Sequence, residues 1–149
     1  RPADVDRFWA STTPDPDTPP SRWLRGMRTA PVVIVPLSSK AAYLVRYAEP
    51  DKAGPGGEHR WPVPYWHVDT GMASLLILQT AVDEGLGACF FGIPRDRVAL
   101  LRAQFGIPEA QVPVGAITVG HRAPDPGAVG SPSRRARRPT QEVVHRGRW

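Results

Sequence analysis

Residues with acid–base, nucleophilic or metal-binding side chains are scattered through this chain of 149 residues. Asp83 and Glu84 are adjacent, so on a helix their side chains diverge and cannot act as a carboxylate pair. The sequence contains no P-loop, GxGxxG, HExxH or GxSxG pattern. The histidines lack the spacing of metal ligands; they are His59, His67, His121 and His145. The sequence therefore offers no catalytic constellation and no metal site. If the protein is an enzyme, we expect a bound cofactor to supply the chemistry.

Arginines are concentrated at the C-terminal end, within the last sixteen residues. They are Arg134, Arg135, Arg137, Arg138, Arg146 and Arg148. Such a basic tail can bind phosphate, nucleic acid or acidic lipid, or it can remain a solvated terminus. A nucleic-acid-binding module also needs aromatic side chains among the positive charges, and this tail offers only Trp149. We therefore expect no nucleic-acid partner.

One long helical pattern dominates the middle of the chain and ends at Gly85. Asp69 and Thr70 are both good N-caps, which predicts that the helix begins at one of them. The segment Met72–Val82 is apolar nearly all round, as is typical of a helix buried in a core or a subunit interface. Gly85 is expected to take the left-handed position that ends the helix.

Shorter elements surround this helix. Helical patterns occupy residues 2–10, a brief stretch after Ser21, residues 40–48, and residues 94–105 before Gly106. Residues 31–37 form a continuously apolar run, typical of a strand covered on both faces. Residues 88–91 are a short apolar strand-like run, residues 112–120 are predicted to form a second core strand, and residues 141–145 are a candidate short edge strand. Proline-rich residues 12–20 and 50–64 predict loops. The alternation indicates an α+β fold, a mixed α/β sandwich, in a single domain of residues 1–149 whose basic tail begins at residue 131.

The order of these pieces resembles the nitroreductase family of FMN-dependent oxidoreductases. The matching pieces are MASLLILQTAVDEGLG, ACFFGIP, LRAQFGIPE, VPVGAITVGH, SRRARRP and EVVHRGRW, which together cover about residues 66–149. Upstream, RTAPVVIVPL resembles the strand that precedes this block in the family. The resemblance implies a nitroreductase-like central sheet flanked by helices, and an intertwined homodimer with FMN at the subunit interface. It also implies hydride transfer from NAD(P)H through the flavin N5 to a nitro, quinone or similar flat acceptor.

The resemblance assigns the flavin contacts to two segments and leaves the catalytic chemistry to the flavin itself. The first segment consists of Cys89, Phe90, Phe91 and Gly92. It resembles the loop that passes the pyrimidine and N5 edge of the isoalloxazine, where the backbone N–H of Phe91 or Gly92 would donate to N5 or O4. Arg135 and Arg137 resemble the family's basic pair on the FMN phosphate, a dianion that needs charge-assisted donors.

The family's domain opens with a helix that carries an arginine-rich phosphate motif, followed by a polar Pro-Ser segment, and neither is visible here. One interpretation is that the N-terminal portion is missing from this sequence. We expect this, because loss of an opening helix and strand would expose apolar surface. The alternative is a nitroreductase-fold protein without redox activity that binds or senses a ligand.

Three remaining observations concern the cysteine, the localisation and the aromatic residues near the proline-rich loop. The sole cysteine, Cys89, excludes an intrachain disulfide and is expected to be a buried, inert thiol. No apolar run is long enough to span a bilayer and no signal peptide is visible at the start, which predicts a cytoplasmic protein. Trp61, Tyr65 and Trp66 are expected to pack the proline-rich loop, although they could also roof an acceptor pocket by stacking.

Overall fold

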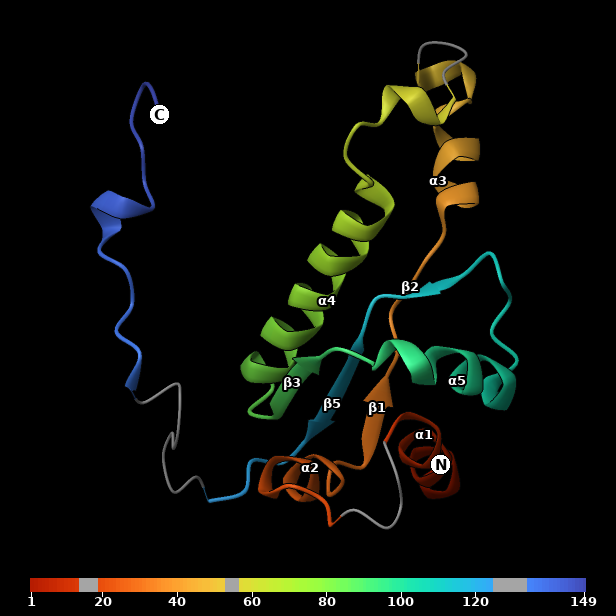
Figure 1. Cartoon of the computed structure of the whole chain (residues 1–149), viewed down its shortest axis with the longest axis vertical. Helices are drawn as coiled ribbons and strands as arrows, with labels where there is room; N and C mark the ends of the chain where they lie inside the picture. Colours follow the sequence, from red (N-terminus) through yellow and green to blue (C-terminus); the bar gives the residue numbers. More distant parts are fainter. Residues whose placement is uncertain (14–18, 53–56, 125–133) are drawn as a thin grey trace.

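The computed structural model describes residues 1–13, 19–52, 57–124 and 134–149. Its helices and strands form an α+β fold, as predicted (Figure 1). In chain order they are α1 (Pro2–Thr12), α2 (Arg22–Met27), β1 (Val32–Ile34), β2 (Leu37–Ser38), α3 (Lys40–Tyr47), α4 (Tyr65–Asp83), β3 (Gly87–Phe91), α5 (Val98–Phe105), β4 (Val112–Pro113) and β5 (Ala116–Gly120). Short 3-10 turns are η1 (Pro50–Lys52), η2 (Glu58–Arg60), η3 (Arg95–Arg97) and η4 (Thr140–Glu142).

The main sheet has three antiparallel strands in the order β1-β5-β3, so the last strand in sequence lies in the middle. Val33 pairs with Thr118 on one side of β5, and Phe91 pairs with Ala116 on the other. A second sheet pairs β2 with β4. Because successive side chains of a strand face opposite sides, β5 contributes to both faces, and Ala116 and Ile117 are both fully buried.

Residues 112–120 form two strands, so the prediction of a single strand is wrong. The chain leaves the second sheet at Val114, whose N–H donates to the carbonyl of Pro36 at 3.0 Å. Gly115 follows, and a β-carbon there would lie 2.5 Å from the Phe90 ring and 2.8 Å from the Phe91 carbonyl oxygen. The close approach of β3 therefore requires glycine at the break.

The strand predicted over residues 31–37 is also divided. β1 covers only Val32–Ile34, lies at the edge of the sheet and leaves Val32 46% exposed, so the prediction of a strand buried on both faces is wrong. Pro36 has no N–H with which to continue the ladder, and Leu37 starts the second sheet.

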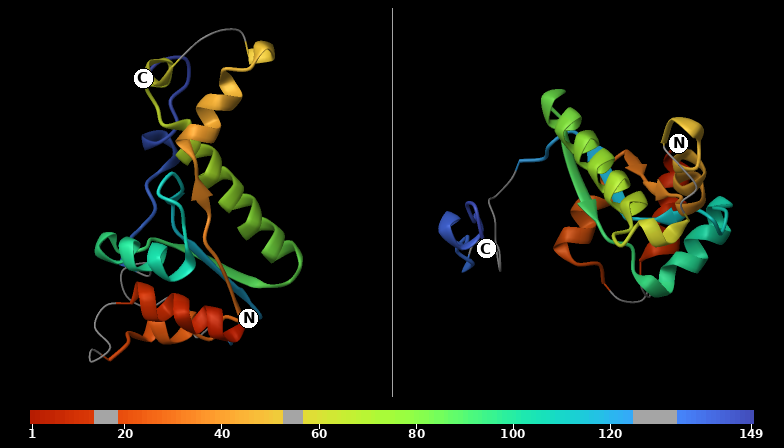
Figure 2. Two further views of the ribbon diagram at one scale, coloured as in Figure 1. Left: turned by 90° about the vertical axis from the view of Figure 1, so that its right-hand side faces the viewer. Right: turned by 90° about the horizontal axis from the view of Figure 1, so that it is seen from above.

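Helices cover both faces of the main sheet (Figure 2). α4 packs on one face, against β3 and β5. On the other side α1, α2 and α5 surround a core of Phe8, Trp9, Leu101 and Ala116. Val5 of α1 and Phe105 of α5 also pack against this core, and α5 ends as expected at Gly106, whose φ is +62°.

The long helix begins at Tyr65, four residues before the predicted caps. Thr70 lies inside the helix, where its hydroxyl donates to the carbonyl of Trp66 at 2.8 Å. No side chain caps the first turn; Tyr65 instead packs against Trp61, with ring centroids 5.7 Å apart. The end is as predicted: Gly85 has φ +71°, and the next amide, of Leu86, donates to the carbonyl of Ala81 at 2.7 Å.

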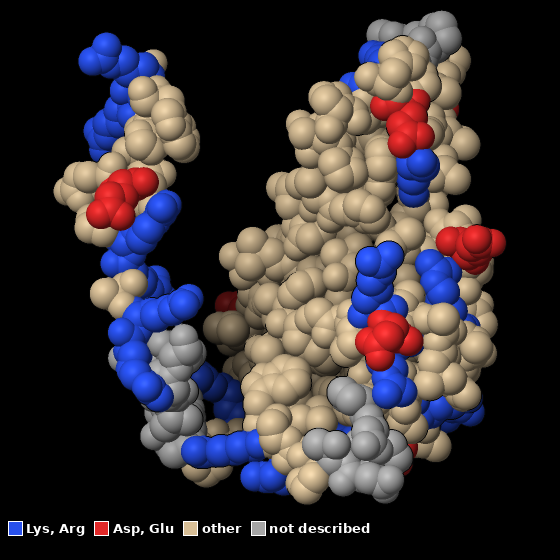
Figure 3. All heavy atoms as spheres, in the orientation of Figure 1, with Lys and Arg blue, Asp and Glu red and all other residues tan. Residues whose placement is uncertain are grey.

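The apolar surface of α4 is only partly covered within one chain. Ser74 and Ala81 are the buried residues of this helix. The large side chains of Met72, Leu75, Leu76 and Val82 are exposed by 54–70%. The surface over α4 in Figure 3 shows hardly any charged side chain. Burial of this helix in the core of one chain is therefore wrong, and the alternative of a subunit interface stays a prediction.

The C-terminal tail contains no strand among its described residues. Residues 141–145 were expected to form an edge strand, but Thr140–Glu142 is a 3-10 turn and Val143–His145 is irregular. The first tail residues, 131–133, lie outside the described residues. In the ranges that the structure describes, no helix is long and apolar enough to cross a membrane.

Candidate functional site

The backbone at the end of β3 offers an open surface. Phe91 and Ile93 are half-buried and pack on the core, whereas Gly92 between them is exposed. The ladder with β5 ends at the pair Phe91–Ala116, and a β-carbon at Gly92 would meet no atom within 4 Å. A flat ring can therefore approach the backbone of Gly92 closely. This is the position that the sequence predicts for the flavin.

The side chain of Phe91 is occupied by packing. Its ring stacks on Trp9, with centroids 5.6 Å apart and an interplanar angle of 7°. Trp23 meets it edge-on at 5.5 Å, and Phe8 does so at 6.4 Å. The Phe91 ring thus belongs to the core on the α1 side of the sheet, which leaves only its backbone for a ligand.

Phe90 faces the opposite side of the sheet and is 39% exposed. Its ring lies over Gly115, at the break between β4 and β5. Phe90 is thus the aromatic residue of this segment whose side chain remains accessible.

Cys89 is half-buried, and desolvation raises the pKa of its thiol. Its Sγ lies 3.7 Å from the carbonyl oxygen of Phe90, a weak contact. Among the described residues, no group of three or more His, Cys, Asp or Glu side chains could hold a metal ion. The thiol is thus less buried than the sequence predicts, and its inertness stays a prediction.

Alkylation tests the state of this thiol. Because the raised pKa lowers the thiolate fraction, we expect iodoacetamide at pH 8 to modify Cys89 several-fold more slowly in the folded protein than in urea. Mass spectrometry of the time course measures both rates. Equal rates would contradict a protected, protonated thiol.

Arg135 and Arg137 lie in the exposed tail, which Figure 1 draws apart from the rest of the chain. Among the described residues, neither arginine forms an ion pair, and the tail's ring contact is internal, between His145 and Trp149 at 4.1 Å. A single chain thus does not bring the two arginines to Gly92. Figure 3 shows several basic side chains spaced along the tail, with an acidic side chain among them.

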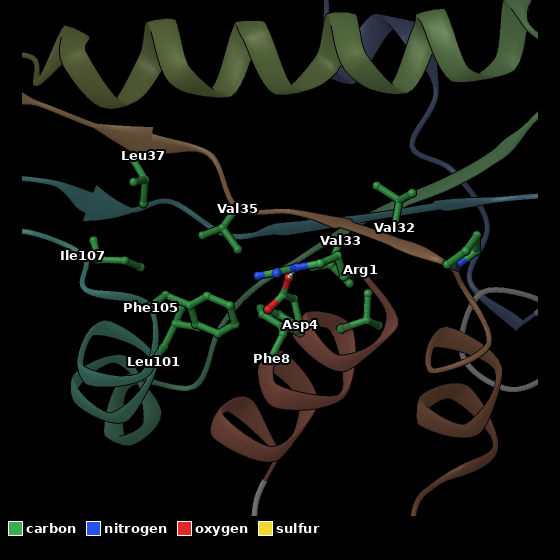
Figure 4. A pocket seen from close by; sticks show the side chains of 12 residues that line it. Arg1, Asp4, Phe8, Val32, Val33, Val35, Leu37, Leu101, Phe105 and Ile107 are labelled. Atoms are coloured by element: carbon green, nitrogen blue, oxygen red, sulfur yellow. Dashed lines mark hydrogen bonds and ion pairs between the residues drawn. The ribbon is translucent and has the colours of Figure 1, made fainter.

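Apart from the surface at Gly92, an apolar cavity of about 340 Å³ lies between α1, β1 and α5 (Figure 4). Phe8, Val33, Leu101 and Phe105 contribute to its wall. At its rim the guanidinium of Arg1 hydrogen-bonds to Asp4 at 3.0 Å, which holds the pKa of that carboxyl below its usual range. None of the predicted flavin contacts lines this cavity. The sequence did not reveal it, because its walls are brought together from distant segments.

The aromatic residues of the proline-rich loop pack on one another and on α3. Trp61 meets Tyr43 at 5.1 Å and Tyr47 at 4.6 Å, and Tyr43 also meets Trp66 at 6.0 Å. The pKa of Tyr43 is raised to about 12, mainly because the phenol is desolvated and to a smaller extent because it hydrogen-bonds with Tyr47. These contacts correspond to the packing role that the sequence favours.

Ser38 and His67 form a hydrogen-bonded pair that was not predicted from the sequence. Ser38 is 1% exposed, and its Oγ lies 2.7 Å from Nδ1 of His67. Ser38 Oγ also approaches the carbonyl of Val112 at 3.4 Å. The pair therefore joins α4 to the two-stranded sheet, and the buried serine is not accessible to a substrate.

Comparison with known proteins places this geometry in a family. The sequence model described as "Nitroreductase family" matches residues 8–121. Over 65 residues, covering 42% of this chain and 34% of the relative, the sequence is 40% identical to a candidate NADH dehydrogenase/NAD(P)H nitroreductase of Methanothermobacter thermautotrophicus.

Two solved structures share the fold over the whole chain. A candidate oxidoreductase of Bacteroides fragilis gives a TM-score of 0.66 at 17% identity, with 100% of this chain and 54% of that chain covered. NfrA2 of B. megaterium gives 0.66 at 20% identity, with 100% and 55% covered. The chain thus spans about a third of the length of the sequence relative and about half of these structures. Because the family model matches most of its length, the chain belongs to the nitroreductase family.

Proposed function

We propose that this chain forms part of an FMN-dependent oxidoreductase that moves hydride from NAD(P)H to a nitro, quinone or similar flat acceptor. The observation that carries the proposal is the exposed backbone of Gly92, held between two anchored apolar side chains in a member of this family. FMN, when bound, supplies the hydride chemistry at its N5 atom. The residues of this chain bind and orient the cofactor and shape the space around it.

The residues present fit a flat cofactor at the end of β3. The amides of Phe91 or Gly92 would donate to the polar edge of the ring system, and the open space at Gly92 allows the ring to approach. The partly exposed side chain of Phe90 would contact the flavin ring system. Cys89 would contribute its main chain and the volume of its side chain to the wall of the site. Arg135 and Arg137 would bind the phosphate with charge-assisted hydrogen bonds.

We also propose a homodimer in which α4 lies at the subunit interface. Its exposed aliphatic side chains adjoin a shallow groove of about 770 Å³ lined by Leu76, Leu78, Val82 and neighbouring polar residues. Full burial of such a side chain stabilises by roughly 1.5–3 kcal/mol, so several of them can offset the cost of association. A dimer would also allow the tail of one copy to bring its arginines to the flavin edge of the other.

The dimer is tested at Leu76, which is 63% exposed. Replacing it with glutamate would bury an unpaired charge at the interface, so we expect Leu76→Glu to be a monomer at concentrations where the wild type is a dimer. Analytical ultracentrifugation measures the change. The matched control is Val45→Glu on α3, a residue exposed by 67%, which we expect to leave the dimer intact. A dimeric Leu76→Glu variant would contradict the proposed interface.

The redox function is tested with FMN and NAD(P)H. We expect purified protein to quench the fluorescence of added FMN on binding, and the complex to oxidise NAD(P)H when a nitroaromatic or quinone is supplied. Absence of FMN binding would contradict the proposal. FMN binding without NAD(P)H oxidation for any such acceptor would favour the alternative of a ligand-binding protein without redox activity.

A further inference from the structure

We infer that Trp9 is a positioning residue that fixes the backbone of Gly92 for cofactor binding by clamping the ring of Phe91. The inference rests on the proposed function, since it assigns a role to a residue behind the proposed FMN edge. Trp9 belongs to α1 and is 5% exposed, so it cannot itself touch a ligand at Gly92. Its action must therefore pass through Phe91.

The clamp holds Phe91 from two directions. Trp9 lies almost parallel to the ring, with an interplanar angle of 7° and a centroid distance of 5.6 Å, and this offset stacking is a favourable aromatic geometry. Trp23 of α2 meets the same ring edge-on, at an angle of 81°. With one face and one edge blocked, the Phe91 ring cannot change rotamer without displacing a neighbour. The direction of the Phe91 backbone is fixed accordingly.

Gly92 depends on this clamp because it has no side chain of its own. Its preceding neighbour, Phe91, is held by Trp9, and its following neighbour, Ile93, packs on the same core cluster. The hydrogen-bonded ladder to β5 ends one residue before Gly92. Anchors on both sides thus replace the ladder at the point where the amide must face a ligand, and loss of one anchor would let the amide reorient.

The polar atom of Trp9 shows which of its properties matters. Its Nε1 is buried and lacks a hydrogen-bond partner among the described residues, a state that costs free energy. The indole is therefore used for its flat ring and not for its N–H group. This predicts that phenylalanine can replace Trp9 in its positioning role, whereas an aliphatic residue cannot.

The experiment compares Trp9→Phe and Trp9→Leu with Trp61→Leu as the matched control. Trp61 also carries a buried Nε1 without a partner and packs among aromatic rings, but its ring partners are Tyr43, Tyr47 and Tyr65 and not Phe91. Each variant is measured by thermal unfolding, by the dissociation constant of FMN, and by hydrogen exchange of the Gly92 and Ile93 amides without FMN. The midpoint potential of bound FMN provides a further readout that a loss of stability alone does not move.

We expect Trp9→Leu to weaken FMN binding about 5- to 10-fold, the effect of one misdirected hydrogen bond, and to shift the midpoint potential. It should also accelerate amide exchange at Gly92 and Ile93 relative to the rest of β3. Trp9→Phe should stay within about twofold of the wild type. Trp61→Leu should lower the melting temperature but retain wild-type FMN affinity and wild-type exchange at Gly92.

Two results would overturn the inference. One is wild-type exchange at Gly92 and Ile93 in Trp9→Leu; the other is FMN affinity that falls equally in Trp9→Leu and Trp61→Leu, in proportion to lost stability. If the leucine variant does not fold, Trp9→Met, which keeps a longer apolar side chain, undergoes the same measurements. Failure of the wild type to bind FMN would instead refute the proposed function, and amide exchange would then decide the positioning role alone.

Discussion

Replacing Gly115 with alanine is expected to destabilise the fold and to displace the proposed flavin edge at the same time. The new β-carbon would lie 2.5 Å from the Phe90 ring and 2.8 Å from the carbonyl oxygen of Phe91, and the second of these atoms belongs to the backbone. Since a backbone atom cannot rotate away, β3 must shift. Overpacking of this kind costs about 1–3 kcal/mol. Urea unfolding measures the loss of stability, and FMN titration measures the displaced edge.

The matched control is Gly26→Ala in α2, where a β-carbon would meet nothing within 4 Å. There we expect a gain of about 0.5–1 kcal/mol, because alanine has the higher helix propensity. A Gly115→Ala variant as stable as Gly26→Ala would show that β3 and β5 do not approach closely at this point. It would also remove the reason for the division between β4 and β5.

Removing both Arg135 and Arg137 is expected to give the largest loss of FMN affinity. A hydrogen bond to a charged group contributes about 1.5–3 kcal/mol, so each arginine bound to the phosphate accounts for about 10- to 150-fold in affinity. The double variant Arg135→Gln, Arg137→Gln should therefore bind FMN at least about 100-fold more weakly. Its affinity for riboflavin, which lacks the phosphate, should change little. Fluorescence titration with both ligands measures the difference.

The control for charge is the double variant Arg146→Gln, Arg148→Gln, in the same exposed tail. It removes the same net charge from residues outside the predicted phosphate pair. If it weakens FMN binding as strongly, the tail acts by its overall positive charge and the assignment to Arg135 and Arg137 is wrong.

The elements that could be predicted from the sequence are those with strong local signals. Pro94 and Gly106 bound the segment that contains α5, and Gly85 stops α4 by adopting a left-handed conformation that few other residues tolerate. The apolar run after Gly87 forms β3 as expected. In each case the deciding interaction lies within a few residues of the chain.

The predictions that the structure contradicts are those that depend on contacts between residues distant in the sequence. α4 starts at Tyr65 without the side-chain cap that the sequence led us to expect, and the ring of Tyr65 packs on Trp61. The break at Gly115 depends on Phe90, twenty-five residues earlier. Likewise, only the fold shows that the ring of Trp9 stacks on Phe91. The strand that carries the proposed flavin segment was thus predictable, whereas the residues that pack behind it were not.

The position of β5 between β1 and β3 also determines when this protein can fold during synthesis. Val33 pairs with Thr118, so the sheet joins segments that lie 85 residues apart in the sequence. Contacts of such long range slow folding and leave apolar strands exposed until the last one arrives. In the part of the chain that the structure describes, β1 and β3 pair only with β5, so these pairings cannot be completed on the nascent chain until Gly120 has left the ribosome. The basic tail follows β5, so it emerges only after the strands of the sheet are complete.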